Sequence, residues 1–65
     1  MNELMIVIED GSWLYFVTSA TTAIDAWLSF RNAMEKIGIN DNNVNYTKAI
    51  LRNANGKDIE TLRIG

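Results

Sequence analysis

Residues 21–38 read TTAIDAWLSFRNAMEKIG, and this stretch decides the fold because no other stretch is long and periodic enough to predict a helix. Its apolar residues recur at spacings of three and four, which places them on one side of a 3.6-residue repeat. They are Ala23, Ile24, Trp27, Phe30, Met34 and Ile37. The opposite side is polar. The pattern therefore predicts one amphipathic helix that packs on an apolar surface.

Both ends of this predicted helix carry capping signals. Thr22 followed three residues later by Asp25 is typical of a capping box, in which each side chain accepts a hydrogen bond from the other residue's amide. Gly38 can adopt the left-handed conformation that ends a helix, and Lys36 suits the negative end of the helix dipole. We therefore expect the helix to begin after Thr22 and to end before Gly38.

Two residues break the helical pattern. Leu28 falls on the polar side, so we expect either a leucine at the edge of the core or a contact with a partner. Arg31 falls within the apolar arc near the helix end. We expect its aliphatic stem to lie on the core and its charged head to reach water, where it is a candidate contact for a small anion.

Residues 4–8 and 13–17 are apolar runs on either side of a turn sequence. Asp10-Gly11 between them predicts a hairpin with a two-residue loop, because both loop positions need positive φ. In that register one face carries Ile6, Ile8, Trp13 and Tyr15, and the other carries Met5, Val7, Leu14 and Phe16. We expect the second set beneath the helix, since it lacks polar atoms, and the first set on an outer face. The alternation alone also allows the opposite assignment.

A second hairpin is predicted further along the chain, with strands at 44–53 and 57–64. Ala54-Asn55-Gly56 between them is again a tight-turn sequence. This hairpin also carries apolar residues on both faces, although more weakly than the first. The two sets are Val44, Tyr46 and Ile50 on one face, and Ala49 and Leu51 on the other.

The register of the second hairpin stays open between two possibilities. A two-residue loop places Ala49 opposite Leu62. A three-residue loop, with Gly56 in a bulge, places Arg52 opposite Asp58 instead. The sequence does not separate them.

The order hairpin, helix, hairpin over residues 1–65 predicts a single small α+β domain (ββαββ) with one helix on a four-stranded sheet. Together with the local sequence TTAIDA at 21–26, this layout resembles β-grasp domains, in particular the small immunoglobulin-binding domains of bacterial surface proteins. The resemblance implies strand order 2-1-4-3 with parallel terminal strands in the centre. An all-antiparallel order 4-3-1-2 is the alternative. No functional residue and no immunoglobulin binding is carried over, because the outer sheet face is predicted to be apolar here.

Several kinds of chemistry lack their residues in this chain. It has no cysteine and no histidine, which excludes disulfides, thiolate sites and imidazole metal sites. Asp41, Asn43 and Asn45 match three ligand positions of an EF-hand loop, but Tyr46 and Arg52 stand where the loop needs glycine and glutamate. No glycine-rich loop and no nucleophile with a nearby base stands out. We therefore expect a non-enzyme without metal or cofactor.

Charge and hydropathy limit the location of the protein and its partners. The net charge of −2 argues against binding to duplex DNA or anionic membranes, which requires a basic face. The longest apolar runs have five residues, far fewer than a membrane span needs. Since no export leader is recognisable, we expect a cytoplasmic protein. Frequent asparagine and isoleucine are typical of AT-rich genomes, so we expect a phage or bacterial accessory protein.

The surplus of apolar surface is the main indication of function. A chain of 65 residues buries a small core, and two hairpins that are apolar on both faces expose more than one helix covers. We therefore predict a protein-interaction module that forms a homodimer or higher oligomer through its outer sheet face and binds or inhibits a host protein. The predicted interface residues are Trp13, Tyr15, Ile6, Ile8 and Leu28.

Two other functions stay open. In the first, Trp13 and Tyr15 stack on single-stranded nucleic acid while cationic side chains contact its phosphates, although the net charge disfavours this partner. In the second, Arg31 or the same cations hold a small anion or nucleotide at a subunit interface. The cations of the hairpins are Lys48, Arg52 and Arg63.

Overall fold

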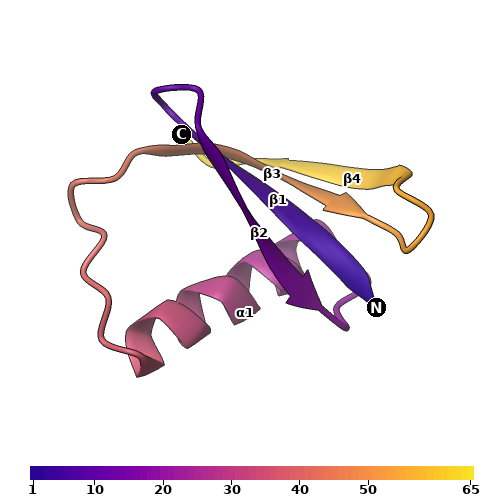
Figure 1. The fold of residues 1–65 in the computed structure, drawn as a ribbon, viewed down its shortest axis with the longest axis horizontal. Helices are drawn as coiled ribbons and strands as arrows, with labels where there is room; N and C mark the ends of the chain where they lie inside the picture. The colour runs from indigo at the N-terminus through magenta and orange to yellow at the C-terminus, as the bar shows by residue number, and fades with distance from the viewer.

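The computed structural model describes all residues from 1 to 65 as four strands and one helix (Figure 1). In chain order the elements are β1 (Asn2–Ile8), β2 (Trp13–Thr18), α1 (Ala23–Lys36), β3 (Tyr46–Arg52) and β4 (Asp58–Arg63). This ββαββ order confirms the predicted α+β fold. No helix combines the length and the apolar character that crossing a bilayer requires.

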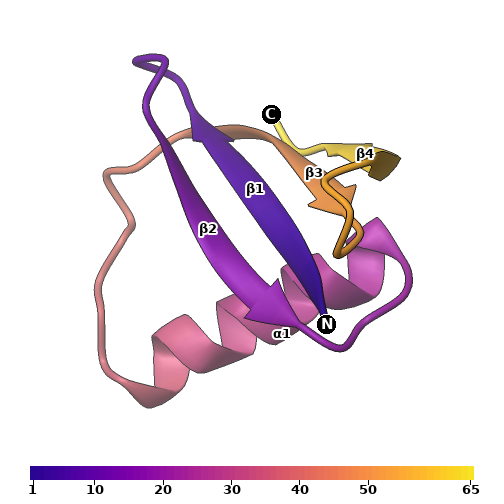
Figure 2. The same ribbon diagram turned by 45° about the vertical axis from the view of Figure 1, so that its right-hand side comes forward.

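The strands form one antiparallel sheet in the order β2-β1-β3-β4, and α1 crosses behind it in Figure 2. This is the all-antiparallel alternative. The order implied by the β-grasp resemblance is wrong, because β1 pairs with β3 and not with a parallel β4. Residues 37–45 bring the chain from α1 to the Ile8 end of β1, where β3 begins. β3 therefore runs back along β1, and these two strands form the centre of the sheet.

The first hairpin is shifted by one residue from the predicted register. Its loop is Glu9-Asp10-Gly11, closed by a hydrogen bond from the Ile8 amide to the Ser12 carbonyl (2.8 Å). The glycine has a φ of +89°, as expected for the last position of a three-residue hairpin loop. Ile6 consequently pairs with Leu14. Because side chains alternate along a strand, the shift moves every β1 side chain to the other face relative to β2.

This shift changes which residues of β1 reach the helix. Leu4 and Ile6 are completely buried beneath α1. Met5 and Val7, which were predicted to lie in the core, are on the opposite face of the sheet. The predicted sets were therefore right for β2 and wrong for β1.

A bulge in β3 turns Tyr46 toward the helix. Lys48 pairs with Val7 and Tyr46 already pairs with Ile8, so Thr47 is an extra residue without a partner in β1. A bulge of this kind shifts the alternation of side chains along its strand. Tyr46 therefore packs against the core, whereas unbroken alternation predicted it on the face opposite Ala49 and Leu51.

The second hairpin combines the two registers that the sequence left open. Near the turn, Arg52 pairs with Asp58, as a three-residue loop requires. Further from the turn, Ala49 pairs with Leu62, as a two-residue loop requires. Ile59 is the extra residue that joins the two registers in a bulge of β4.

The helix begins and ends as predicted. At its start the Thr22 hydroxyl accepts a hydrogen bond from the Asp25 amide (3.3 Å), whereas the second bond of the predicted capping box, from the Thr22 amide to the Asp25 carboxylate, is not formed. At its end, Gly38 is left-handed with a φ of +74°, and the amides of Gly38 and Ile39 donate to carbonyls of the last helical turn. These two bonds form a Schellman motif.

The core lies between α1 and the sheet. Leu14 and Phe16 pack against it as predicted, and the rings of Phe16 and Phe30 meet edge to face with their centroids 5.6 Å apart. Two residues of the predicted helical stripe are exposed instead: Ile24 lies at the edge of the stripe, and Ile37 caps the end that projects past the sheet (Figure 1). The buried apolar residues are Leu4, Ile6, Ala23, Ala26, Phe30, Ala49 and Leu51.

A side chain from the last strand closes the start of the helix. Glu60 in β4 accepts a hydrogen bond from the Ala23 amide (2.6 Å), although the two residues are 37 positions apart. The first amides of a helix lack partners within the helix, and a carboxylate is favourable at this positive end of the dipole. The contact joins α1 to β4 and was not predicted from the sequence.

Candidate functional site

The sheet face opposite α1 has no cover, and we call it the outer sheet face. Its residues follow from the register, because Leu4, Ile6, Ala49 and Leu51 point to the helix and their neighbours along each strand point away. The outer sheet face consists of three rows that cross from β2 to β4. These rows are Val17, Glu3, Arg52 and Asp58; Tyr15, Met5, Ile50 and Thr61; and Trp13, Val7, Lys48 and Arg63.

The centre of the outer sheet face is apolar. Tyr15, Met5 and Ile50 lie side by side in the middle row. Along β2, Trp13, Tyr15 and Val17 are 56%, 49% and 61% exposed. Contiguous exposed apolar surface with a polar rim is typical of interaction sites in soluble proteins. Tryptophan and tyrosine suit such sites because each joins a large apolar body to a hydrogen-bonding group.

The predicted interface residues of the first hairpin divide between two locations. Trp13 and Tyr15 lie on the outer sheet face, as expected, and their part in binding stays a prediction. Ile6 does not lie there: it is completely buried, because the one-residue shift of the hairpin turns it toward the helix. Val7 takes its place on the outer sheet face. A three-residue loop ending in glycine would have predicted this exchange.

The remaining predicted interface residues lie outside the three rows. Ile8 is half-buried at the end of β1, where it pairs with Tyr46 at the β3 bulge. Leu28 is 57% exposed, but it belongs to α1, which packs on the other side of the sheet. Leu28 is therefore part of a different surface, and a single partner covering the outer sheet face does not reach it.

The predicted anion contacts are not equally available. Lys48 and Arg63 are exposed neighbours on the outer sheet face, and neither forms an ion pair. Arg52 lies on the same face but donates to Asp58 (Nε to Oδ1, 2.7 Å), and this hydrogen bond raises the pKa of Arg52. Arg31 belongs to α1, which packs on the other side of the sheet. The free positive charge of the outer sheet face is thus concentrated at one end of β3 and β4.

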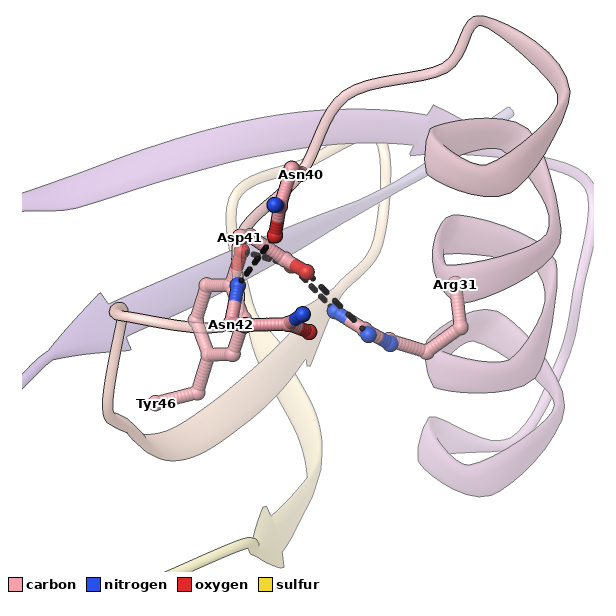
Figure 3. A network of polar contacts seen from close by, with 5 residues as sticks. All are labelled: Arg31, Asn40, Asp41, Asn42 and Tyr46. Carbon is pink, nitrogen blue, oxygen red and sulfur yellow. Dashed lines mark hydrogen bonds and ion pairs between the residues drawn. The ribbon is translucent and has the colours of Figure 1, made fainter.

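Arg31 is held in a polar network beside the C-terminal half of α1 (Figure 3). Its guanidinium forms a two-pronged ion pair with Asp41, in which Nη2 lies 3.3 Å from Oδ1, and the Tyr46 hydroxyl donates to the same carboxylate (2.6 Å). The guanidinium carbon is also 5.7 Å from the ring centroids of Trp27 and Tyr46, a distance suited to cation–π contact. A carboxylate thus already occupies the position predicted for a bound anion.

The network shifts the acidity of its members. The hydrogen bond from Arg31 has the largest effect on the pKa of Asp41 and lowers it below its usual value. The hydrogen bond from Tyr46 lowers this pKa further. The pKa of Tyr46 is raised to about 12, mainly because the side chain is partly buried and also because its hydroxyl donates to Asp41. Since its carboxylate turns inward to Arg31, Asp41 does not join Asn43 and Asn45 as a ligand group. The network instead ties residues 37–45 to the helix and to β3.

Elsewhere the polar contacts are local. Asn45 donates to Glu9 (2.6 Å) beside the first turn, and Ser12 donates to Asp10 within it. No three acidic side chains gather in an arrangement that could hold a metal ion. The outer sheet face is therefore the most extensive candidate site in the structure.

In comparisons with known proteins, the chain matches no family model, no curated protein and no solved structure.

Proposed function

We propose that the protein is a non-enzymatic cytoplasmic interaction module of phage or bacterial origin that binds a protein partner through its outer sheet face. By covering the partner's surface it inhibits that partner. The observation that carries this function is the uncovered apolar centre of the face, where Tyr15, Met5 and Ile50 lie in one row beside Trp13 and Val17.

The residue types of the outer sheet face favour a protein partner. Tyrosine, tryptophan, methionine and arginine are enriched where proteins meet, and the face presents Tyr15, Trp13, Met5 and Arg63 together. The small core supports the same function, because only seven apolar residues are buried within the domain. Covering the outer sheet face would add apolar burial that a chain of this length cannot obtain alone.

The charges of the face describe the surface that fits it. Lys48 and Arg63 form a positive end next to Trp13 and Val7. At the other end Glu3 is negative, while Asp58 is neutralised by Arg52 (2.7 Å). We therefore expect the partner to present an apolar patch with carboxylates opposite Lys48 and Arg63, since complementary charge sets orientation and speeds association.

A comparison of two equally exposed sites tests this function. Replacing Trp13 and Tyr15 by serine removes aromatic surface from the outer sheet face, whereas Leu28→Ser removes a 57% exposed residue from the helix. Proteins captured from a lysate of the encoding organism are quantified for wild type and for both variants, and folding of each is checked by circular dichroism. The candidate partner is then purified and titrated against all three proteins.

The expected result is a purified partner whose affinity falls at least about a hundredfold when Trp13 and Tyr15 are replaced, since central aromatic residues contribute 2 kcal/mol or more. Leu28→Ser should leave that affinity unchanged. A partner that tolerates the double replacement but not Leu28→Ser would move the binding site to α1 and overturn the assignment to the outer sheet face.

Single-stranded nucleic acid is a second candidate partner, because exposed aromatic residues and free cations share one face. Trp13 lies in the same row as Lys48 and Arg63, an arrangement suited to base stacking beside phosphate contacts. Titration with oligothymidylate at low salt should then quench Trp13, and Trp13→Phe should abolish the change while Trp27 still emits. Unchanged fluorescence of the wild type would exclude this partner.

A further inference from the structure

The two edge strands of the sheet differ in how their outer sides, which we call the borders of the sheet, are protected against pairing with a further strand. β4 forms one border and carries Asp58, Glu60 and Arg63 as well as a bulge at Ile59. Charges and bulges of this kind prevent exposed edges from pairing. β2 forms the other border and reads WLYFVT, with no charged residue, no proline and a regular register along β1. The β2 border is therefore open to strand pairing.

The register shows which backbone groups this border offers. The hydrogen bond from the Ile8 amide to the Ser12 carbonyl (2.8 Å) makes these two residues a hydrogen-bonded pair. In an antiparallel ladder such pairs alternate with non-hydrogen-bonded pairs. Counting on from Ser12, every second residue turns its amide and carbonyl toward β1. The amides and carbonyls of Trp13, Tyr15 and Val17 therefore point out of the sheet, where no strand accepts them.

We propose that a second copy of the chain pairs its own β2 antiparallel with this border, with Tyr15 on the two-fold axis. Two four-stranded sheets then become one continuous sheet. Tyr15 lies opposite the partner's Tyr15, and Trp13 lies opposite the partner's Val17. In this register the outward amides and carbonyls of all three residues are paired, and a two-fold axis makes the contact identical in both copies.

The chemistry of β2 favours a second copy as the occupant. Because the strand is uncharged, pairing it with itself places no like charges opposite each other. On the helix side, Leu14 and Phe16 are only half-buried, whereas their pairing partners Ile6 and Leu4 on β1 are completely buried. In the dimer, Leu14 lies opposite the partner's Phe16, and each covers the other.

The helix end on this side of the molecule is also apolar and exposed. Figures 1 and 2 both show the C-terminal end of α1 projecting past the β2 border. Ile37 caps this end and is 67% exposed, and Ile39, just beyond it, is 50% exposed. A second copy at the β2 border approaches from the side on which these residues lie.

The β2 border takes the place of the outer sheet face, which the sequence predicted as the homodimer interface, and this association differs from the partner binding proposed above in the groups that it uses. It depends on the backbone of β2 and on the helix-side contact of Leu14 with the partner's Phe16, whereas the protein partner binds the side chains that project from the outer sheet face. The two inferences can therefore fail independently, and different variants test them.

A single introduced cysteine tests the register directly, since the natural chain has none. Tyr15→Cys would place two thiols in a hydrogen-bonded antiparallel pair, whose Cα atoms lie about 5.5 Å apart, within the range that a disulfide spans. Mild oxidation should rapidly give a covalent dimer. Thr61→Cys, in the same row but on β4, is the matched control and should stay monomeric under the same oxidation.

A proline at the border tests the backbone contact. Val17→Pro removes an amide that points away from β1, so the β1–β2 ladder keeps its bonds, while the dimer loses a hydrogen bond in each copy. Val17→Thr is the control that keeps the amide. In sedimentation equilibrium at tens of micromolar, wild type and Val17→Thr should give an average molecular mass of about twice the 7.3 kDa of one chain. Val17→Pro should raise the dimer dissociation constant at least about tenfold.

Two results would overturn the inference. One is a wild-type protein that stays monomeric at these concentrations and shows no disulfide at Tyr15→Cys. The other is a dimer that Val17→Pro leaves intact but that Ile50→Thr, in the centre of the outer sheet face, dissociates. If Val17→Pro fails to fold, the comparison of the two cysteine variants decides alone.

Discussion

Ile6 and Val7 are adjacent in β1, yet the structure places Ile6 in the core and Val7 on the outer sheet face. Replacing each by alanine therefore tests the register of the first hairpin. In the register with a two-residue loop, Val7 would be the core residue and Ile6 the exposed one. The relative stability of Ile6→Ala and Val7→Ala distinguishes the two registers without a new structure.

The expected magnitudes follow from burial. Ile6 is 0% exposed, and Ile6→Ala removes three buried carbons at about 0.8 kcal/mol each, to which the cavity left in a packed core adds further cost. We expect a loss of about 3 kcal/mol in the free energy of unfolding. Val7 is half-buried on an uncovered face, so Val7→Ala should cost about 1 kcal/mol or less. A domain of this size has a total stability of only roughly 3 to 10 kcal/mol.

Thermal unfolding followed by circular dichroism measures both variants. At about 4 to 8 °C per kcal/mol for a small domain, Ile6→Ala should lower Tm by at least about 12 °C, and Val7→Ala by much less. If Ile6→Ala does not fold, Ile6→Val takes its place, with an expected loss of about 1 kcal/mol. Equal losses at both positions, or a larger loss at Val7, would refute this register of the first hairpin.

Thr22→Ala should lower the stability of the helix by about 1 kcal/mol in urea unfolding, with the exposed neighbour Thr21→Ala as a near-neutral control. The pKa of Asp41 is lowered in the folded state, so its contribution to stability is fully present above its unfolded pKa near 3.8. That contribution is lost as the pH falls from this value through the lower folded-state pKa. The stability of Asp41→Asn should accordingly change less than that of wild type between pH 5 and pH 2, and an unchanged acid profile would contradict the network. The pKa of Tyr46 is raised from 10.0 to about 12, so ultraviolet titration should show a late tyrosinate transition that Tyr46→Phe removes. Stability from this group is present below pH 10 and is lost as the pH rises toward 12; a Tyr46 that titrates near 10 would refute the arrangement.

The helix was predictable because its determinants are local. Its period and both caps involve residues no more than one or two turns apart, such as Thr22 with Asp25. Interactions within such a short span do not depend on how the rest of the chain folds. The structure therefore reproduces the predicted start and end of α1.

The hairpin registers were harder to predict because the turn sequences fit more than one loop. Asp10-Gly11 suits a two-residue loop, and Gly11 equally suits the last position of a three-residue loop. The choice depends on whether Ile6 or Val7 fits beneath the helix, which is a contact between distant parts of the chain. The bulge at Thr47 has no sequence signal that we recognise, and it decides where Tyr46 points.

The candidate site was predictable only in part for the same reason. Trp13 and Tyr15 share a face by alternation within β2, whatever the register. Met5, Val7 and Ile50 join them through pairing with β1 and β3, which the sequence left open. The position of Arg31 also depends on the path of residues 37–45, since its partner Asp41 lies ten positions along the chain.

The hydrogen bond from Ala23 to Glu60 has a consequence for the time course of folding. The acceptor for the Ala23 amide is synthesised 37 residues later, so the first turn of α1 lacks this hydrogen bond while the chain emerges. Until β4 is in place, the Thr22 cap alone holds that end. Domains fold largely as units during synthesis. This one should accordingly gain protease resistance in a single late step, when β4 becomes free to pair with β3.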